Sequence, residues 1–318
     1  MAQPTGTFSS YDAVGNREDL SDVIHDVSPT DTPFLSAIKK VEATGTNHEW
    51  QTDALTAASG TNAHIEGDDA TPVAPAATTR LGNYTQILKK HAVIPGTQEA
   101  VLKAGRKSEM AYQVARRLPE LKRDCESSMI GTVAIGNAKV AGNDTTAREM
   151  GSLFTYMTTN VSLGATGAVS TGDGSDVMTT GTDRDLTEAI VDTVLATTYT
   201  SGGNPNMLCV SPTNKTVVGD FDPTGATRNV DTNDGKLVAS VDVYVGDFHT
   251  LQVVPCRQLI GDNVIALDPE YMAIAELRGV TTSDLAKTGD STRKEIVWEC
   301  TLEVCNEAAH ALIADTNG

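Results

Sequence analysis

The chain has 318 residues, enough to bury a substantial core in two domains or in one elaborated domain. Its net charge of -18 argues against a protein that grips nucleic-acid phosphates through clustered Lys and Arg, so any contact with nucleic acid is expected to be loose. No segment approaches the roughly 18 apolar residues of a membrane span, and the first residues lack the features of a signal peptide, which predicts a cytoplasmic origin and no membrane contact.

The first ~40 residues predict an extended arm with short helical turns, because the segment is polar and interrupted by Pro29 and Pro33. Its scattered apolar anchors are Leu20, Val23, Ile24, Phe34, Leu35 and Ile38.

A β-hairpin with a long tip is predicted next. The stretches "TNHEWQTDALTA" and "RLGNYTQILKKHAVI" read as strands, and they flank a segment rich in Gly, Pro, Ala and Thr that has almost nothing to bury. A tip of about twenty residues is unusual inside a compact domain, so it is either mobile or held by something outside this chain. A loose surface loop is the alternative interpretation.

Residues Arg106 to Gly131 predict one amphipathic helix about 39 Å long. Pro119 lies on its polar flank, where it removes a hydrogen bond and is expected to bend the helix, either as a tolerated kink or as a hinge. Arg116 and Glu120 form an i,i+4 pair on the polar side. The apolar arc has spacings of three and four residues and consists of Met110, Val114, Leu118, Leu121, Cys125 and Met129.

A loop-rich connection from Asn137 to Asp183 leads into an α/β lobe, and only "MGSLFTYM" in the connection suggests packing. The lobe is predicted to hold a helix from about Asp185 to Tyr199, the strand "MLCV", and a second helix with Ser211 at the N-cap and Pro212 at N1. The stretches "DVYVGDFHTLQVVP" and "NVIALDPEYMAIAELRG" then read as strands. The fold class is therefore α+β, in which the chain leaves a body, builds a lobe and returns.

The residues from Glu295 to Val304 alternate strictly and predict a strand with one buried face and one acidic face. The acidic face carries Glu295, Glu299 and Glu303, for which two interpretations stay open: a solvated sheet face, or a row of ion pairs with a neighbouring subunit. Under the second, replacing all three by Gln should weaken assembly without unfolding the subunit.

The last 40 residues also contain an arrangement that suggests a serine hydrolase. Lys287, Asp290 and Ser291 lie together, and His310 follows, but the strand between Ser291 and His310 rises about 3.3 Å per residue and should hold them roughly 35 Å or more apart. A nucleophile and its base need about 3 Å. We therefore interpret "LAKTGDS" as a hairpin turn and expect no catalytic residues within one chain.

The cysteines and histidines predict no metal site and no cofactor. The five cysteines are scattered without a C-x-x-C pair, and we expect most to be small buried core residues. Cys300 and Cys305 are five residues apart on an expected strand, so they face opposite sides and share neither a metal nor a disulfide. The histidines at positions 25, 64, 91 and 249 have no companions at ligand spacing.

This order of elements resembles the major capsid protein of tailed bacteriophages with the Hong Kong 97 fold. The stretches "DLSDVIHDVSPTDTPFLSAI", "HEWQTDAL", "NPNMLCVSPTNK" and "SDLAKTGDSTRKEIVWECTLEVCNEAAHALI" carry the resemblance along nearly the whole chain. It implies an α+β fold of five ranges: an N-terminal arm (1–40), an E-loop (41–96), a peripheral domain with its spine helix and the loop-rich connection (97–182), an axial domain (183–261), and a return to the peripheral domain (262–318).

The resemblance implies a structural protein that self-assembles through pentamers and hexamers into an icosahedral shell around double-stranded DNA. It is then no enzyme. The expected partners are further copies of the chain, a portal protein, a separate scaffolding protein and a decoration protein, with assembly in the bacterial cytoplasm and final location in the virion. The candidate residues for assembly are Trp50, Arg116, Arg117, Pro119, Lys287, Asp290, Glu295, Glu299 and Glu303.

Some relatives lock their shells through a lysine of the E-loop, but Ala54 to Thr79 contain no lysine, so no such covalent mesh is expected. Two alternatives stay open: an oligomeric hydrolase in which Ser291 of one chain meets His310 of another, and a different self-assembling phage protein, either a tail tube or a decoration protein.

Overall fold

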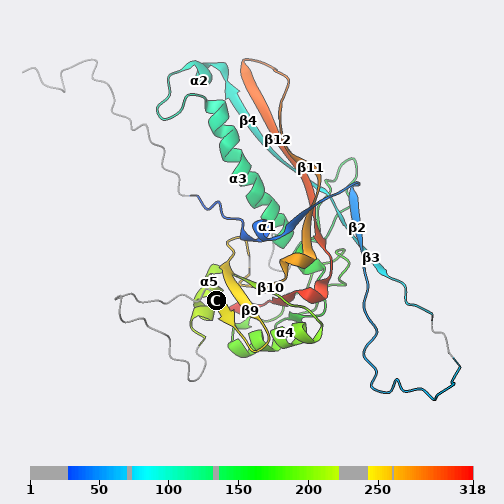
Figure 1. Cartoon of the computed structure of the whole chain (residues 1–318). Coiled ribbons are helices and arrows are strands. Elements are labelled where there is room, and N and C mark those ends of the chain that lie inside the picture. The colour runs from blue at the N-terminus through cyan, green and yellow to red at the C-terminus, as the bar shows by residue number, and fades with distance from the viewer. Residues whose placement is uncertain (1–27, 70–73, 132–135, 222–242, 260, 318) are drawn as a thin grey trace, which may run out of the picture.

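The computed structural model describes residues 28–69, 74–131, 136–221, 243–259 and 261–317. Figure 1 shows a lobe built on one long helix and long strands, a second lobe with shorter elements, and a loop that projects away from both. The described residues thus form the expected α+β fold. The arm residues 1–27 and its anchors Leu20, Val23 and Ile24 lie outside the described residues, as do residues 70–73 of the hairpin tip and residues 222–242 of the expected axial domain.

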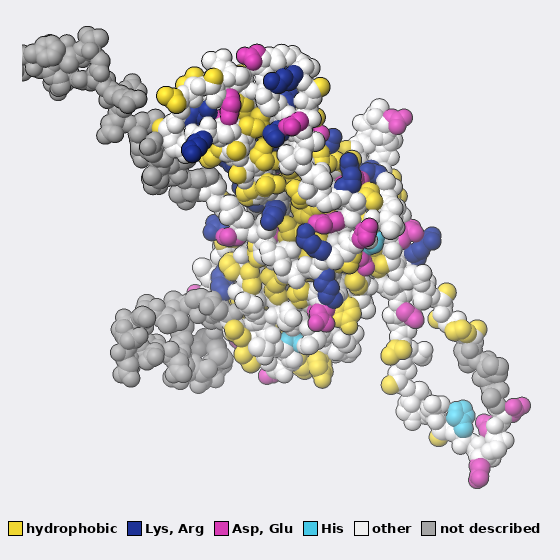
Figure 2. All heavy atoms as spheres, turned by 45° about the horizontal axis from the view of Figure 1, so that its top comes forward, with side chains coloured by type: hydrophobic (Ala, Val, Ile, Leu, Met, Phe, Trp, Pro, Cys, Tyr) yellow, Lys and Arg dark blue, Asp and Glu magenta, His cyan; other side chains and the backbone are white. Residues whose placement is uncertain are grey.

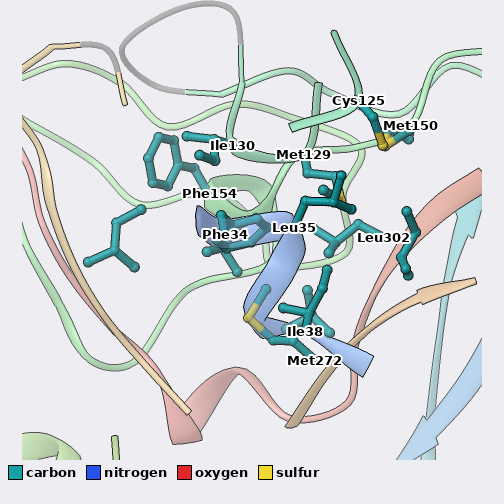
Figure 3. Close-up of a cluster of buried hydrophobic side chains, with 14 of the residues drawn as sticks. Phe34, Leu35, Ile38, Cys125, Met129, Ile130, Met150, Phe154, Met272 and Leu302 are labelled. Atoms are coloured by element: carbon teal, nitrogen blue, oxygen red, sulfur yellow. The ribbon is translucent and has the colours of Figure 1, made fainter. Parts of the chain in front are cut away.

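The described part of the arm begins with the short helix α1 (Pro33–Ala37), which has proline at its first position, and continues into strand β1 (Lys39–Glu42). Three apolar side chains of this segment, Phe34, Leu35 and Ile38, are buried. Figure 3 shows them packed among Met129, Ile130 and other side chains of the main core. The arm is therefore anchored where its predicted apolar residues lie.

The projecting hairpin has strands β2 (Asn47–Thr52) and β3 (Thr79–Tyr84), which pair antiparallel with Trp50 opposite Leu81. The second predicted strand is in fact two strands, because β4 (Gln86–Pro95) leaves the hairpin at Thr85 and joins another sheet. The N–H of Thr85 donates to the carbonyl of Thr46, which closes the base of the hairpin.

A four-stranded sheet in the order β1-β11-β12-β4 carries the long lobe. Strand β11 (Met272–Asp284) pairs parallel with β1 and antiparallel with β12 (Ser291–Val304), which pairs antiparallel with β4. The register of β11 shifts between Glu276 and Thr281. The predicted closing strand is thus confirmed and is longer than the alternating stretch. The short helix α2 (Gly96–Ala100) follows β4.

Helix α3 (Glu109–Ile130) confirms the predicted long helix. The hydroxyl of Ser108 accepts the N–H of Ala111 at the N-terminus, and Gly131, with a φ of 119°, ends the helix. The helix runs without interruption through Pro119. Its predicted apolar arc faces the core, with Val114 and Leu118 only partly buried.

The loop-rich connection behaves as predicted, because its packing segment "MGSLFTYM" is buried in the core around the 3-10 turn η1 (Leu153–Thr155). The second lobe confirms both predicted helices, and Ser211 caps the second by accepting the N–H of Asn214. The remaining elements are β5 (Val161–Ser162), β6 (Arg184–Asp185), α4 (Glu188–Thr200), β7 (Met207–Val210), α5 (Pro212–Gly219), β8 (Val243–Val245), β9 (Thr250–Pro255), β10 (Val264–Leu267), η2 (Pro269–Tyr271), η3 (Glu307–Ala309), β13 (Ala311–Ile313) and β14 (Thr316–Asn317).

The second lobe is built on a six-stranded sheet in the order β5-β13-β10-β7-β9-β8. Strands β10 and β13 come from the range 262–318, which was expected to return to the other lobe, and β5 comes from the connection. The expected boundary at residue 261 therefore does not separate the two sheets. The apolar patterns in the sequence predicted that these segments form strands. They did not predict which strands lie next to each other in the sheet, because that depends on contacts between distant parts of the chain.

Candidate functional site

The turn between β11 and β12 is the hairpin turn that the sequence predicts, and it holds Lys287 and Asp290. The carbonyl of Asp290 accepts the N–H of Gly96 at 3.1 Å, and a Cβ at position 96 would lie 2.5 Å from the Asp290 carboxylate. A larger residue at position 96 would therefore have to displace the Asp290 side chain. Both Lys287 and Asp290 are exposed, and the backbone carbonyl of Asp290 ties the turn to α2.

Two members of the acidic row on β12 are paired with Lys or His side chains of the same chain. Glu295 lies 3.3 Å from both Lys89 Nζ and His91 Nε2, and the hydrogen bond from Lys89 lowers the pKa of Glu295. Glu303 lies 2.9 Å from His48 Nε2 at the base of the projecting hairpin, and this bond lowers the pKa of Glu303. The row thus joins β12 to β4 and to the hairpin.

The third member, Glu299, corrects the expectation of a solvated acidic face, because it is only 3% exposed. Its carboxylate accepts Thr85 Oγ1 at 3.0 Å, Arg148 Nη2 at 2.6 Å and Arg278 Nε at 2.6 Å. The three donors come from the end of the hairpin, from the connection and from the irregular part of β11. The sequence pattern missed this because cations far away in the chain cover the face.

Trp50 is buried within its own chain, with its ring centroid 5.7 Å from that of Tyr156. On α3, the predicted pair of Arg116 and Glu120 is long, at 4.0 Å, and Arg117 makes the closer contact with Glu120 at 2.6 Å. Pro119 lies between these residues on the half-buried side of the helix. The structure therefore spreads the candidate residues over the base of the hairpin, α3 and the β11–β12 hairpin and does not gather them in one cleft.

A composite hydrolase site between two chains is ruled out by the burial of His310, which is 0% exposed. Its Nδ1 accepts the N–H of Asp268 at 3.2 Å, and burial lowers the pKa of His310 to about 4. A base enclosed in its own chain cannot reach Ser291 of a second chain, so this alternative was wrong.

Among the described residues, no group of three or more His, Cys, Asp or Glu side chains could hold a metal ion. No described helix is long and apolar enough to cross a membrane.

Two carboxylates that accept backbone N–H groups were missed. Glu126 of α3 is fully buried and accepts the N–H of Leu35 at 3.1 Å. Its spacing of three and four residues from Met129 and Ile130 places it on the buried face of the helix, and this was the sequence signal that could have identified it. Glu307 accepts the N–H groups of Thr158 and Thr159, both at 3.1 Å, and gave no signal in the sequence.

The loop between β2 and β3 is a long segment whose described side chains are not buried in their own chain. All its described residues, 53–69 and 74–78, are exposed, with Leu55 at 100% and Ile65 at 82%. Figure 2 shows it clear of the body, with hydrophobic and acidic side chains along it. A segment that exposes large apolar side chains in this way fits a binding surface for another molecule.

Comparisons with known proteins agree along the whole chain. A family model described as SU10 major capsid protein matches residues 3–317. The chain is 25% identical over 349 residues to the major capsid protein of Escherichia phage Phieco32, an alignment that covers 100% of this chain and 99% of the relative.

Solved capsid structures have the same fold. A chain of the Cyanophage A-1(L) capsid asymmetric unit has a TM-score of 0.67 at 14% identity, covering 98% of this chain and 99% of that one. A chain of the capsid of the native GTA particle has a TM-score of 0.63 at 13% identity, covering 97% and 98%.

Proposed function

The chain belongs to the SU10 major capsid protein family, and from this premise we propose that the loop between β2 and β3 binds a neighbouring subunit in the shell. As a member of this family it is a structural protein of an icosahedral head shell, built from self-associating subunits and located in the virion. The Hong Kong 97 fold is confirmed, and the tail-tube and decoration alternatives were wrong.

The exposure of Leu55 and Ile65 carries the proposal. Such exposed apolar side chains add little to the stability of the isolated subunit, whereas each Å² that they bury against a neighbour contributes about 25 cal/mol, less the cost of ordering the loop. Repetition of the contact around closed rings makes a modest gain per copy sufficient. The absence of lysine from Ala54 to Thr79 supports a non-covalent contact.

The finer organisation belongs to the same proposal. Copies form pentamers and hexamers, with the second lobe, to which residues 183–261 were assigned as the axial domain, at the centre of each ring. A portal protein, a separate scaffolding protein and a decoration protein are the further partners, and assembly takes place in the bacterial cytoplasm. The net charge of -18 supports loose contact with the packaged double-stranded DNA, and the structural role supports the absence of enzymatic activity.

Electron microscopy of the purified protein, alone and with its neighbouring phage gene products, tests the proposal. Closed shells or rings of five and six are expected for the wild type. The double variant Leu55→Ser, Ile65→Ser should keep the unfolding midpoint of the subunit and lose the shells, because neither side chain packs in its own chain. Ser59→Ala, in the same exposed loop, is the matched control and should assemble normally.

Two results would contradict the proposal. Shells formed by the double variant as efficiently as by the wild type would exclude the loop as an interface. A wild-type protein that gives only a small oligomer, even with its phage partners, would contradict the ring organisation.

A further inference from the structure

Helix α1 of the arm is docked over a buried acid. Glu126 Oε2 accepts the N–H of Leu35 at 3.1 Å, and the N–H of Phe34 also faces this carboxyl. Both N–H groups belong to the first turn of α1, where no acceptor exists within the helix itself. Glu126 Oε1 has no hydrogen-bond partner. The arm and α3 are therefore joined at one carboxyl group.

The surroundings of this carboxyl are apolar. Figure 3 shows α1 resting on a cluster that includes Met129, Ile130 and Phe154, next to Cys125 of α3. None of the ion pairs among the described residues involves Glu126. An ionised carboxylate at this place has lost its water, and only two N–H groups replace it.

The titratable groups around Glu126 do not compensate its charge. The pKa values of Cys125 in α3 and Cys209 in β7 are raised, first by hydrogen bonds with the thiols of Cys300 and Cys256 and by burial, and to a smaller extent by the charge of Glu126, so both are neutral thiols. On either side of α1, the charged groups are directed elsewhere: Asp31 to Arg257, Lys39 to the carbonyl of Glu270, and Lys40 to Glu276.

We propose that Glu126 is a protonation-controlled latch for the arm: the neutral acid keeps α1 docked, and ionisation loosens α1 so that water can reach the carboxylate. Helix α1 is suited to this movement because it has only five residues and its outer face, at Ser36, is exposed. When α1 moves away from α3, water can reach the Glu126 carboxylate while α3 itself stays unchanged.

The direction with pH follows from linkage. Burial raises the pKa of Glu126 from 4.5 to about 7 in the folded chain. The stabilisation of the docked arm is therefore complete below pH 4.5, falls as the pH rises towards about 7, and stays constant above it. The fraction of molecules in which α1 has moved away and Glu126 is fully hydrated therefore rises about tenfold for each pH unit between pH 4.5 and about 7.

Hydrogen-deuterium exchange of the full chain, corrected for the intrinsic effect of pH, tests the latch in peptides that cover residues 30–42. In the wild type, protection of these amides should fall at least tenfold from pH 5 to pH 7 and change little from pH 7 to pH 8.5. Glu126→Gln imitates the neutral acid, so its protection should not vary with pH. Glu120→Gln, on the same helix but on its charged side, should behave like the wild type.

The wild-type series decides the question even if Glu126→Gln does not fold. Infrared difference spectra should show a protonated carboxyl group that disappears with a midpoint near pH 7, in step with the loss of protection. Equal corrected protection of the wild type at pH 5 and pH 7 would overturn the proposal. So would the same loss of protection in folded Glu126→Gln.

Discussion

Replacing Glu299 by Gln should destabilise the isolated subunit and not only its assembly. The carboxylate is 3% exposed and accepts charged hydrogen bonds from two arginines and a neutral bond from Thr85. Removing one member of a buried ion pair costs about 3 to 5 kcal/mol. The side chains of Arg148 and Arg278 keep 25% and 54% exposure, so water recovers part of this loss. We expect a loss of about 2 to 4 kcal/mol in the free energy of unfolding.

Urea unfolding of the unassembled subunit, followed by circular dichroism, measures this loss. Glu295→Gln is the matched control on the same strand; its partners Lys89 and His91 are about half exposed, so its loss should stay below about 1 kcal/mol. Equal unfolding midpoints for the Glu299 and Glu295 variants would refute the reasoning, because burial of an ion pair would then not determine how much the pair contributes to stability. The triple replacement by Gln is accordingly expected to destabilise the subunit, and not merely to weaken assembly.

The remaining predictions concern the cap, the buried histidine and the shell. Ser211→Ala should cost about 1 kcal/mol in thermal or urea unfolding because the N–H of Asn214 loses its acceptor, and an unchanged midpoint would contradict the cap. Burial lowers the pKa of His310 from 6.5 to about 4, so its contribution to stability, about 3 kcal/mol, is present above pH 6.5 and lost as the pH falls to 4. A folded His310→Gln variant should lack this loss when unfolding is measured across the same range. Intact particles boiled in detergent should release a 33.5 kDa monomer, and a ladder of linked oligomers would show a covalent mesh.

Local patterns predicted the elements well where one physical signal dominated. The arc of α3, the cap at Ser211 and the strand β12 are confirmed by the structure, but residues 296–302 of β12 are buried on both faces and do not show the predicted alternation of a buried and a solvated face. The strand expected from residue 80 to residue 94 was divided at Thr85, because its two halves have similar strand patterns and pair with different partners. Periodicity shows that a segment can form a strand, and pairing decides which sheet it joins.

For the candidate site as well, the sequence predicted where residues lie along a strand but not which residues they contact, as the acidic row of Glu295, Glu299 and Glu303 shows. Alternation placed Glu295, Glu299 and Glu303 in one row, but it left open whether water or another chain would cover them. The answer for Glu299 comes from Arg148, 151 residues away in the sequence, and for Glu303 from His48, 255 residues away. No local signal indicates such partners.

The sequence by itself determined the α+β class, the long helix, the projecting hairpin and the resemblance that led to the family, because hydrophobic spacing and turn residues act over a few neighbouring positions. Only the tertiary structure decided which strands share a sheet, that Glu299 lies between two arginines, and that Glu126 lies beneath α1. Burial and ion pairing depend on residues brought together from distant parts of the chain, and a carboxylate has the same local sequence whether water or a neighbouring helix covers it.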